Sequence, residues 1–301
     1  MRENKTLLWS WISFIIVLII FIAMVEAYHH IKKERSYDYQ CRILINKNTV
    51  VESEDDLIKP NIKEKKDSDD KFYEDTKYGY LPKISPDGGR VFDEYSAVVT
   101  IKNDFKKIRL AILVNNSSID NLLKTVQKWK ITFIIPNYLD NFSEVIQKIR
   151  KEGHEFFLQI PTQSSIPAEK KTIVSPFLAN SNDTIDKLLY LLSSCKYAIG
   201  IANVTPTLIT KSKNDVCLIS NELSKRGLAF LNIEKPNDLF ISQKNELIYI
   251  NITHIFDEKT FNKFSINNGD ILLIDQKDVQ GFIRNIVGEC ELIPVSAFEK
   301  E

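Results

Sequence analysis

Apolar residues beyond about residue 110 follow two alternating patterns. Short continuous apolar runs, typical of buried strands, alternate with stretches in which apolar residues recur at i, i+3, i+4 and i+7, as in an amphipathic helix. The runs predict strands at 110–114, 131–135, 155–160, 197–202, 228–232, 247–250, 270–274 and 291–295. The stripes predict helices at 119–126, 142–149, 185–192, 214–225 and 276–287.

The regularity of this alternation predicts an α/β fold. Strand-helix-strand units place parallel strands in one sheet with right-handed crossovers, which gives either a barrel or a doubly wound sheet. Six or seven such units favour a distorted (β/α) barrel, and no GxGxxG follows the first strand to suggest a dinucleotide site. Residues 233–268 carry one strand signal and a weak helix signal, which leaves their place in the barrel open.

The N-terminal region has a different pattern. Residues 7–25 are apolar, broken only by two serines, and contain no charge or proline. A helix of this length spans about 28 Å, close to the hydrocarbon thickness of a bilayer. We therefore expect residues 1–27 to be a single-pass anchor in the inner (cytoplasmic) membrane, with a cleaved signal peptide or an apolar core helix as alternatives. Basic residues flank the run on both sides, so the positive-inside rule leaves its orientation open.

Charge separates this anchor from the predicted domain. Residues 52–77 are rich in Asp, Glu and Lys and poor in apolar residues, which predicts a flexible linker, with bounds 28–77, before a domain at 78–301. The whole chain has 40 acidic and 40 basic residues and no basic stripe, so a nucleic-acid partner is not expected. Four scattered cysteines without a CxxC are predicted to be buried free thiols; they are Cys41, Cys195, Cys217 and Cys290.

Five segments, in this order, carry a family resemblance. They are 79–88 (GYLPKISPDG), 131–136 (ITFIIP), 153–161 (GHEFFLQIP), 200–203 (GIAN) and 292–297 (LIPVSA). Together they resemble the divergent polysaccharide deacetylase family, which has a distorted (β/α) barrel. The resemblance implies a hydrolase of C–N amide bonds in acetylated sugars, linked to envelope carbohydrate metabolism. It also implies a divalent, zinc-like metal held by one Asp and two His, with a second Asp as the base.

The positions that match this metal site carry other residues here. The Asp pair corresponds to Asn115 and Asn116, the first His to Gln159 and the second to Val204. Neutral amides and an aliphatic side chain supply neither an anionic ligand nor an imidazole. We therefore expect no catalytic residue, no metal and no cofactor at these positions.

Other residues offer no obvious replacement. His154 lies at the family's GHE position, and we expect it to be structural, with its imidazole bonded to a loop carbonyl. His29, His30 and His254 stand outside any ligand spacing. Ser117 and Ser118 lack a GxSxG context and are expected to cap the following helix, while Asp120 suits its first turn; their sequence is SSID at 117–120.

Three hypotheses for function follow. The first is a non-catalytic protein that binds a glycan or an envelope protein outside the cytoplasmic membrane. Its cleft would be lined by Asn115, Asn116, Gln159 and Asn203, unless these residues only satisfy strand ends. The second is an active deacetylase with an unconventional metal site. The third is a purely structural envelope protein.

Overall fold

The structure is a computed structural model that describes residues 70–100, 105–171, 174–178, 182–205, 212–233, 247–258, 266–286 and 289–297. All of them lie within one compact unit, Glu54–Glu301. The predicted anchor, His29, His30 and Cys41 lie outside the described residues. Within the described ranges, no helix is both long enough and apolar enough to cross a membrane.

A small hairpin precedes the main sheet. After η1 (Asp70–Phe72), β1 (Tyr73–Thr76) pairs antiparallel with β2 (Gly79–Pro82), and α2 (Val91–Tyr95) follows. The folded part thus begins before residue 78, inside the segment that its charge assigned to the linker. Phe72 and Tyr73 are buried in the core, and Arg226 donates to the Pro82 carbonyl at 2.8 Å. Burial of two large aromatic side chains stabilises this segment despite its many charged neighbours.

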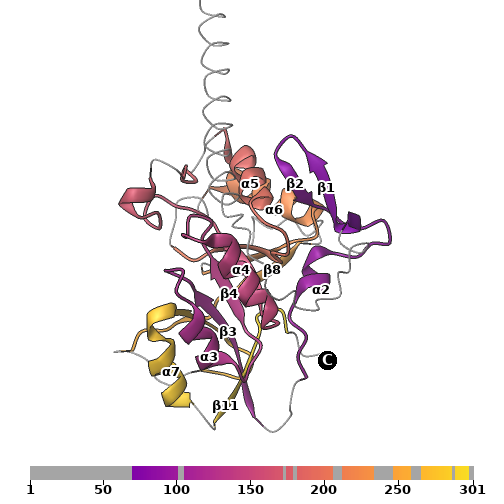
Figure 1. The fold of residues 1–301 in the computed structure, drawn as a ribbon. Helices are drawn as coiled ribbons and strands as arrows, with labels where there is room; N and C mark the ends of the chain where they lie inside the picture. Colours follow the sequence, from indigo (N-terminus) through magenta and orange to yellow (C-terminus); the bar gives the residue numbers. More distant parts are fainter. Residues whose placement is uncertain are drawn as a thin grey trace, which may run out of the picture. The chain divides into compact units, whose positions relative to one another are not determined.

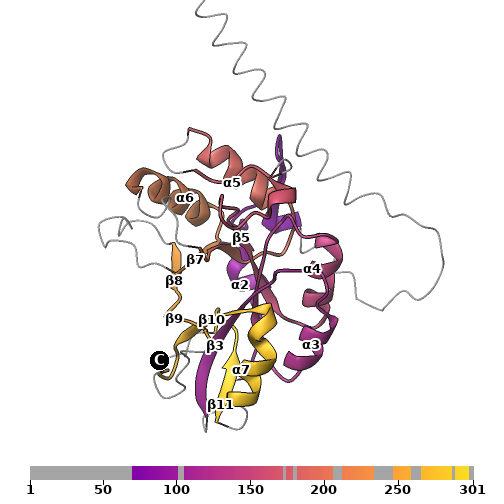
Figure 2. The ribbon, with the colours of Figure 1, turned by 90° about the vertical axis from the view of Figure 1, so that its left-hand side faces the viewer.

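The main sheet is curled and parallel (Figures 1 and 2). Its strand order is β8-β7-β6-β5-β4-β3-β10-β9, and β11 also pairs with β3. All of these pairs are parallel, as the alternation of strands and helices predicted. The strands are β3 (Lys106–Leu113), β4 (Thr132–Ile135), β5 (Glu155–Gln159), β6 (Gly200–Asn203), β7 (Ala229–Asn232), β8 (Ile248–Asn251), β9 (His254–Ile255), β10 (Ile271–Asp275) and β11 (Cys290–Ile293).

The chain itself joins the two outer strands of this sheet. β8 pairs with β7, and after two residues the chain continues as β9, which pairs with β10. At the change of partner, the Ile252 N–H bonds to the Asn232 carbonyl at 2.8 Å and the Thr253 N–H bonds to the Ile271 carbonyl at 3.0 Å. One continuous stretch therefore closes the sheet into a distorted barrel, and it resolves the region around 247–258 that the sequence left unplaced.

Helices cover the outside of the sheet, with α3, α4 and α7 along one side and α5 and α6 over another (Figure 2). Their bounds are α3 (Asp120–Val126), α4 (Phe142–Lys151), α5 (Thr184–Ser193), α6 (Lys213–Lys225) and α7 (Val279–Ile286), with η2 (Ala168–Lys170) and η4 (Gln276–Asp278) as short 3-10 turns. The predicted C′ glycine of α4, Gly153, has φ +76°, the left-handed conformation that suits glycine.

The start of β6 differs from the sequence prediction, and its first residue has to be glycine. β6 begins at Gly200 rather than at 197, because Tyr197 adopts a left-handed φ of +74° that breaks the strand. Gly200 is required there: a Cβ on it would lie 2.2 Å from the Ala229 carbonyl oxygen and 2.8 Å from the Phe157 ring.

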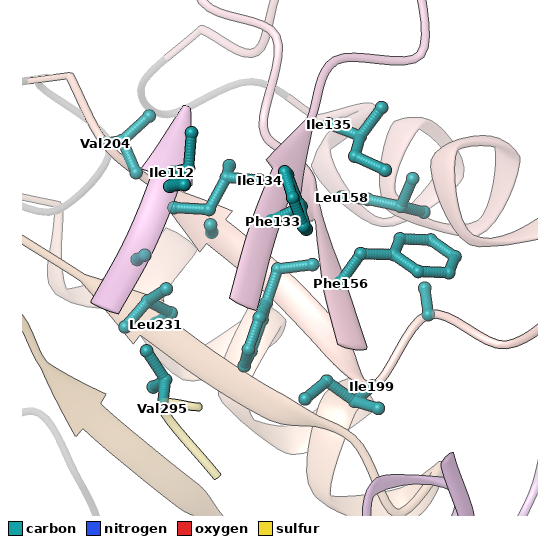
Figure 3. Packing of buried hydrophobic residues seen from close by; sticks show 14 of the residues in the cluster. Ile112, Phe133, Ile134, Ile135, Phe156, Leu158, Ile199, Val204, Leu231 and Val295 are labelled. Atoms are coloured by element: carbon teal, nitrogen blue, oxygen red, sulfur yellow. The ribbon is translucent and has the colours of Figure 1, made fainter. Parts of the chain in front are cut away.

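The core between the strands is apolar and continuous. Figure 3 shows labelled side chains of β3, β4, β5 and β7 together with Val204 and Val295, which follow β6 and β11. β4 and β5, which are apolar apart from Thr132, Glu155 and Gln159 at their ends, are buried throughout. This rigid frame fixes where each strand ends, and therefore where the polar residues after it are placed.

Candidate functional site

The carboxyl end of β3 is tied to the carboxyl end of β10. The backbone N–H groups of Asn115 and Asn116 both bond to Gln276 Oε1, at 2.9 and 3.2 Å. The Asn115 side-chain amide donates to Asp275 Oδ1 at 2.7 Å. Asn116 Oδ1 accepts from the Ser118 N–H at 3.0 Å and from Gln276 Nε2 at 3.3 Å. At the positions of the family's carboxylate pair, two exposed amides thus brace neighbouring strands.

Gln159, the last residue of β5, lies deeper. It is only 3% exposed and carries a neutral amide. Just beyond it, Thr162 Oγ1 lies 3.2 Å from Ser164 Oγ and 3.1 Å from Thr205 Oγ1. Neutral hydroxyl and amide groups therefore occupy the ends of β5 and β6.

A row of asparagines crosses the ends of β6, β7 and β8. Asn203, Asn232 and Asn251 are direct neighbours in the strand register. Asn203 Nδ2 donates to Asn232 Oδ1 at 2.8 Å, and Asn232 Nδ2 donates to Tyr249 Oη at 2.9 Å. Asn203 is 2% exposed, and among the described residues its Oδ1 and that of Asn251 have no donor.

A pocket of about 470 Å³ opens at the carboxyl ends of β3, β9 and β10, with Val204 in its wall. Val204 lines this pocket and Asn203 does not, as expected for consecutive residues of an extended chain. Acidic side chains outnumber basic ones among the described residues in its wall. They are Leu113, Val204, Ile255, Phe256, Asp257, Glu258, Leu273, Asp275, Lys277 and Asp278.

These residues do not suit the metal that the family resemblance implies. The matching positions hold neutral amides and Val204, which has no donor atom, whereas catalytic zinc sites use imidazole, carboxylate or thiolate ligands. No group of three or more His, Cys, Asp or Glu side chains in the described ranges is arranged to hold a metal ion. The carboxylates of the pocket are near the expected place but are not gathered around one point.

The two histidines of the described ranges, His154 and His254, contact protein groups near them. His154 is 1% exposed, its ring packs edge-on against Phe133, and its Nδ1 accepts the Ile131 N–H at 3.2 Å. The predicted bond to a loop carbonyl is therefore wrong: the imidazole is an acceptor for backbone. Burial lowers the pKa of His154 to about 4, so the ring is neutral at pH 7. His254 Nε2 lies 2.8 Å from Asp270 Oδ2.

Three further sequence predictions can be checked. α3 has Ile119 at its N-cap and no side-chain cap bond, so the capping role of Ser117 and Ser118 is wrong. Asp120 does lie in the first turn of α3, where it pairs with Lys148 at 3.0 Å. The three described cysteines form no disulfide among the described residues, but they are half-buried, so the prediction that they are buried is wrong; desolvation raises the pKa of Cys195 to about 12.

The acidic residues of the pocket were not predicted from the sequence. Asp275 follows the strand predicted at 270–274 as directly as Asn115 follows the strand at 110–114, which was a usable signal. Asp257 and Glu258 follow β9, which has only two residues and left no readable pattern.

Comparison with known proteins supports the family resemblance. The model of the divergent polysaccharide deacetylase family matches residues 114–249. Over these residues the predicted family is confirmed. The curled parallel sheet fits the deacetylase-type barrel.

A solved structure shares the fold. The crystal structure of an uncharacterized protein from Agrobacterium tumefaciens C58 is 17% identical, with a TM-score of 0.56. The match covers 72% of this chain and 98% of the other. At this identity the likeness shows the fold alone. No curated protein matches the chain.

Proposed function

We propose that this protein is a non-catalytic relative of the divergent polysaccharide deacetylases that binds a glycan at the carboxyl ends of its barrel strands. The observation that carries the proposal is the residue set at the family's metal site: Asn115, Asn116, Gln159 and Val204. Amides cannot act as a carboxylate base at neutral pH. The Asn115 side chain is also engaged with Asp275, and the Asn116 side chain with Ser118 and Gln276, rather than both being directed at one point.

The chemistry of the pocket suggests the class of glycan. Carboxylates accept hydrogen bonds and attract cations, and Asp257, Glu258, Asp275 and Asp278 line the pocket against one Lys277. A ligand rich in hydroxyl and ammonium donors fits this wall, whereas an anionic polysaccharide would be repelled. We therefore propose a glycan with free amino groups, such as a deacetylated hexosamine polymer, in preference to its N-acetylated form.

The cellular setting is part of the proposal and rests on the sequence. The apolar run at 7–25 would anchor the chain in the inner membrane, with the barrel on the extracytoplasmic side. There the barrel would meet envelope glycans after they have been assembled. An envelope protein is the alternative partner for the same pocket.

The test is a calorimetric titration of the full-length chain with oligomers of glucosamine and, separately, of N-acetylglucosamine, with released acetate measured in the same samples. We expect binding of the glucosamine oligomer, weaker binding of the acetylated one and no acetate. The double variant Glu258→Gln, Asp278→Asn should weaken binding at least about tenfold, or about 1.4 kcal/mol. Asp120→Asn, an exposed carboxylate on α3 outside the pocket, is the matched control.

Each outcome decides between hypotheses. Equal affinity of both variants would remove the pocket from the account. Acetate release would establish the enzyme alternative. Binding of neither oligomer would leave an envelope protein or a structural role as the function of the barrel.

A further inference from the structure

Glu155 is a fully buried carboxylate whose contacts the proposed function does not use. It begins β5, at the amino-terminal end of the barrel, and is 0% exposed. A buried charge is costly unless hydrogen bonds replace its lost water. Here four donors do so, two on each carboxylate oxygen.

The donors come from three distant parts of the chain. Oε1 accepts from Thr132 Oγ1 at 2.6 Å and from the Ser296 N–H at 3.1 Å. Oε2 accepts from the Ala97 N–H at 2.9 Å and from Ser296 Oγ. Ala97 follows α2, Thr132 begins β4, and Ser296 follows β11.

The contacts of Glu155 supply donors to both of its carboxylate oxygens. Thr132 Oγ1 itself accepts the Val295 N–H at 2.7 Å, which leaves its own proton to point at Glu155. The two N–H groups can only donate. The two hydroxyls could also accept a hydrogen bond from a protonated Glu155, but the ionised carboxylate receives a hydrogen bond from all four groups.

The neighbouring charged and titratable groups are arranged around this anion without bonding to it. The Arg150 guanidinium donates to the carbonyls of Tyr95 and His154, at 2.7 and 3.1 Å, and attracts Glu155 electrostatically. His154 is neutral and directs its ring to Ile131. Backbone and hydroxyl donors therefore hold the carboxylate.

We propose that the Glu155 carboxylate is a clasp that locks the segment before β3 and the segment after β11 onto the same end of the barrel. This assigns a joint role to two segments of the family resemblance, GHE at 153–155 and LIPVSA at 292–297, which lie far apart in sequence. The first supplies the acceptor and the second supplies Ser296 and the Val295 N–H. The clasp fixes the two ends of the barrel domain and takes no part in ligand binding at the opposite end.

Amide hydrogen exchange of the full-length chain tests the clasp, with Glu155→Gln as the main variant. Glutamine keeps the shape but places an NH₂ group against donors that need an acceptor. We expect protection at 95–98 and at 292–297 to fall at least about tenfold, while β6 and β7 change less than about twofold. Glu152→Gln, which removes an exposed carboxylate three residues away, should match the parent chain.

Ser296→Ala decides the matter if Glu155→Gln does not fold. This variant deletes only the hydroxyl donor and should lower protection at 292–297 several-fold, with the sheet unchanged. Unchanged protection of 292–297 in a folded Glu155→Gln protein, or in Ser296→Ala, would overturn the clasp. A uniform loss across all strands of a folded Glu155→Gln protein would also overturn it, because a clasp acts locally.

Discussion

The two ends of strand β5 differ in the charge and the hydrogen bonding of their buried polar side chains. At its start, Glu155 has a donor for every position that its carboxylate offers. At its end, Gln159 is almost as buried but carries a neutral amide in place of a charge. The five-residue strand thus joins a fully hydrogen-bonded carboxylate at its start to a neutral amide at its end.

Several buried oxygens at the carboxyl side of the sheet have no hydrogen-bond donor in the part of the chain that the structure describes. Among the described residues, the buried side-chain oxygens without a donor include Oδ1 of Asn137, Asn203 and Asn251. These residues follow or end β4, β6 and β8, all at the carboxyl side of the sheet. Each such group costs about 1–3 kcal/mol relative to a paired one. In barrels the carboxyl side carries ligand sites and the amino side carries stability. Here the three orphaned asparagine oxygens lie on the carboxyl side, whereas His154 Nε2, directly before β5, is an orphaned atom on the amino side.

The largest expected effect is at the start of β5. Glu155→Ala would leave two backbone N–H groups and two hydroxyls without their acceptor, so we expect the free energy of unfolding to fall by about 3–5 kcal/mol. Urea unfolding followed by circular dichroism measures it. Glu152→Ala, at an exposed site nearby, should change stability by less than about 0.5 kcal/mol. If Glu155→Ala lowers the free energy of unfolding by less than about 1 kcal/mol, the hydrogen bonds of Glu155 do not stabilise the amino end of the barrel as described.

The pH dependence of stability tests the burial of His154, which lies beside Glu155 at the start of β5. His154 titrates near 6.5 when unfolded and at about 4 when folded, because burial opposes its charge. The unfolded chain therefore binds the proton first, and the contribution of His154 is complete above pH 6.5 and is lost as the pH falls through 4. The loss amounts to about 3 kcal/mol at most.

Comparison with His154→Phe isolates this contribution. Burial raises the pKa of Glu155, which gives a pH trend of opposite sign that is common to both proteins and cancels in their difference. Unfolding free energies measured from pH 7 to pH 4 should fall more steeply for the parent chain than for the variant. Parallel curves would show that His154 is not held neutral in the folded state.

The smallest effect is expected at the carboxyl side of the sheet, where Asn203 ends β6. Asn203→Leu deletes an orphaned acceptor together with one hydrogen bond to Asn232, two changes of opposite sign. We expect stability to change by less than about 1 kcal/mol in either direction. The same urea unfolding assay checks this. A loss of 3 kcal/mol or more would mean that the asparagine row is structural and would remove the difference between the ends.

The sequence predicted the parallel strands and their helices because both depend on local apolar periodicity. It missed the β1–β2 hairpin, since Tyr73 to Thr76 contains two acidic residues and its burial depends on contacts with distant parts of the chain. The positions of Asn115, Gln159 and Asn203 at strand ends followed from strand length alone. Their different surroundings did not, because Asn115 meets Asp275 only through the pairing of β3 with β10.

The proposed function requires that the residues at the carboxyl ends of the strands bind no catalytic metal and hydrolyse no amide. Calorimetric titration of the full-length chain with zinc, beside the same titration of a Gln159→Ala, Asn116→Ala variant, tests it most directly. The account predicts identical curves for the two proteins, without a tight one-to-one step that depends on either residue. A tight, stoichiometric step that disappears in the variant, accompanied by acetate release from an N-acetylated oligosaccharide, would contradict it.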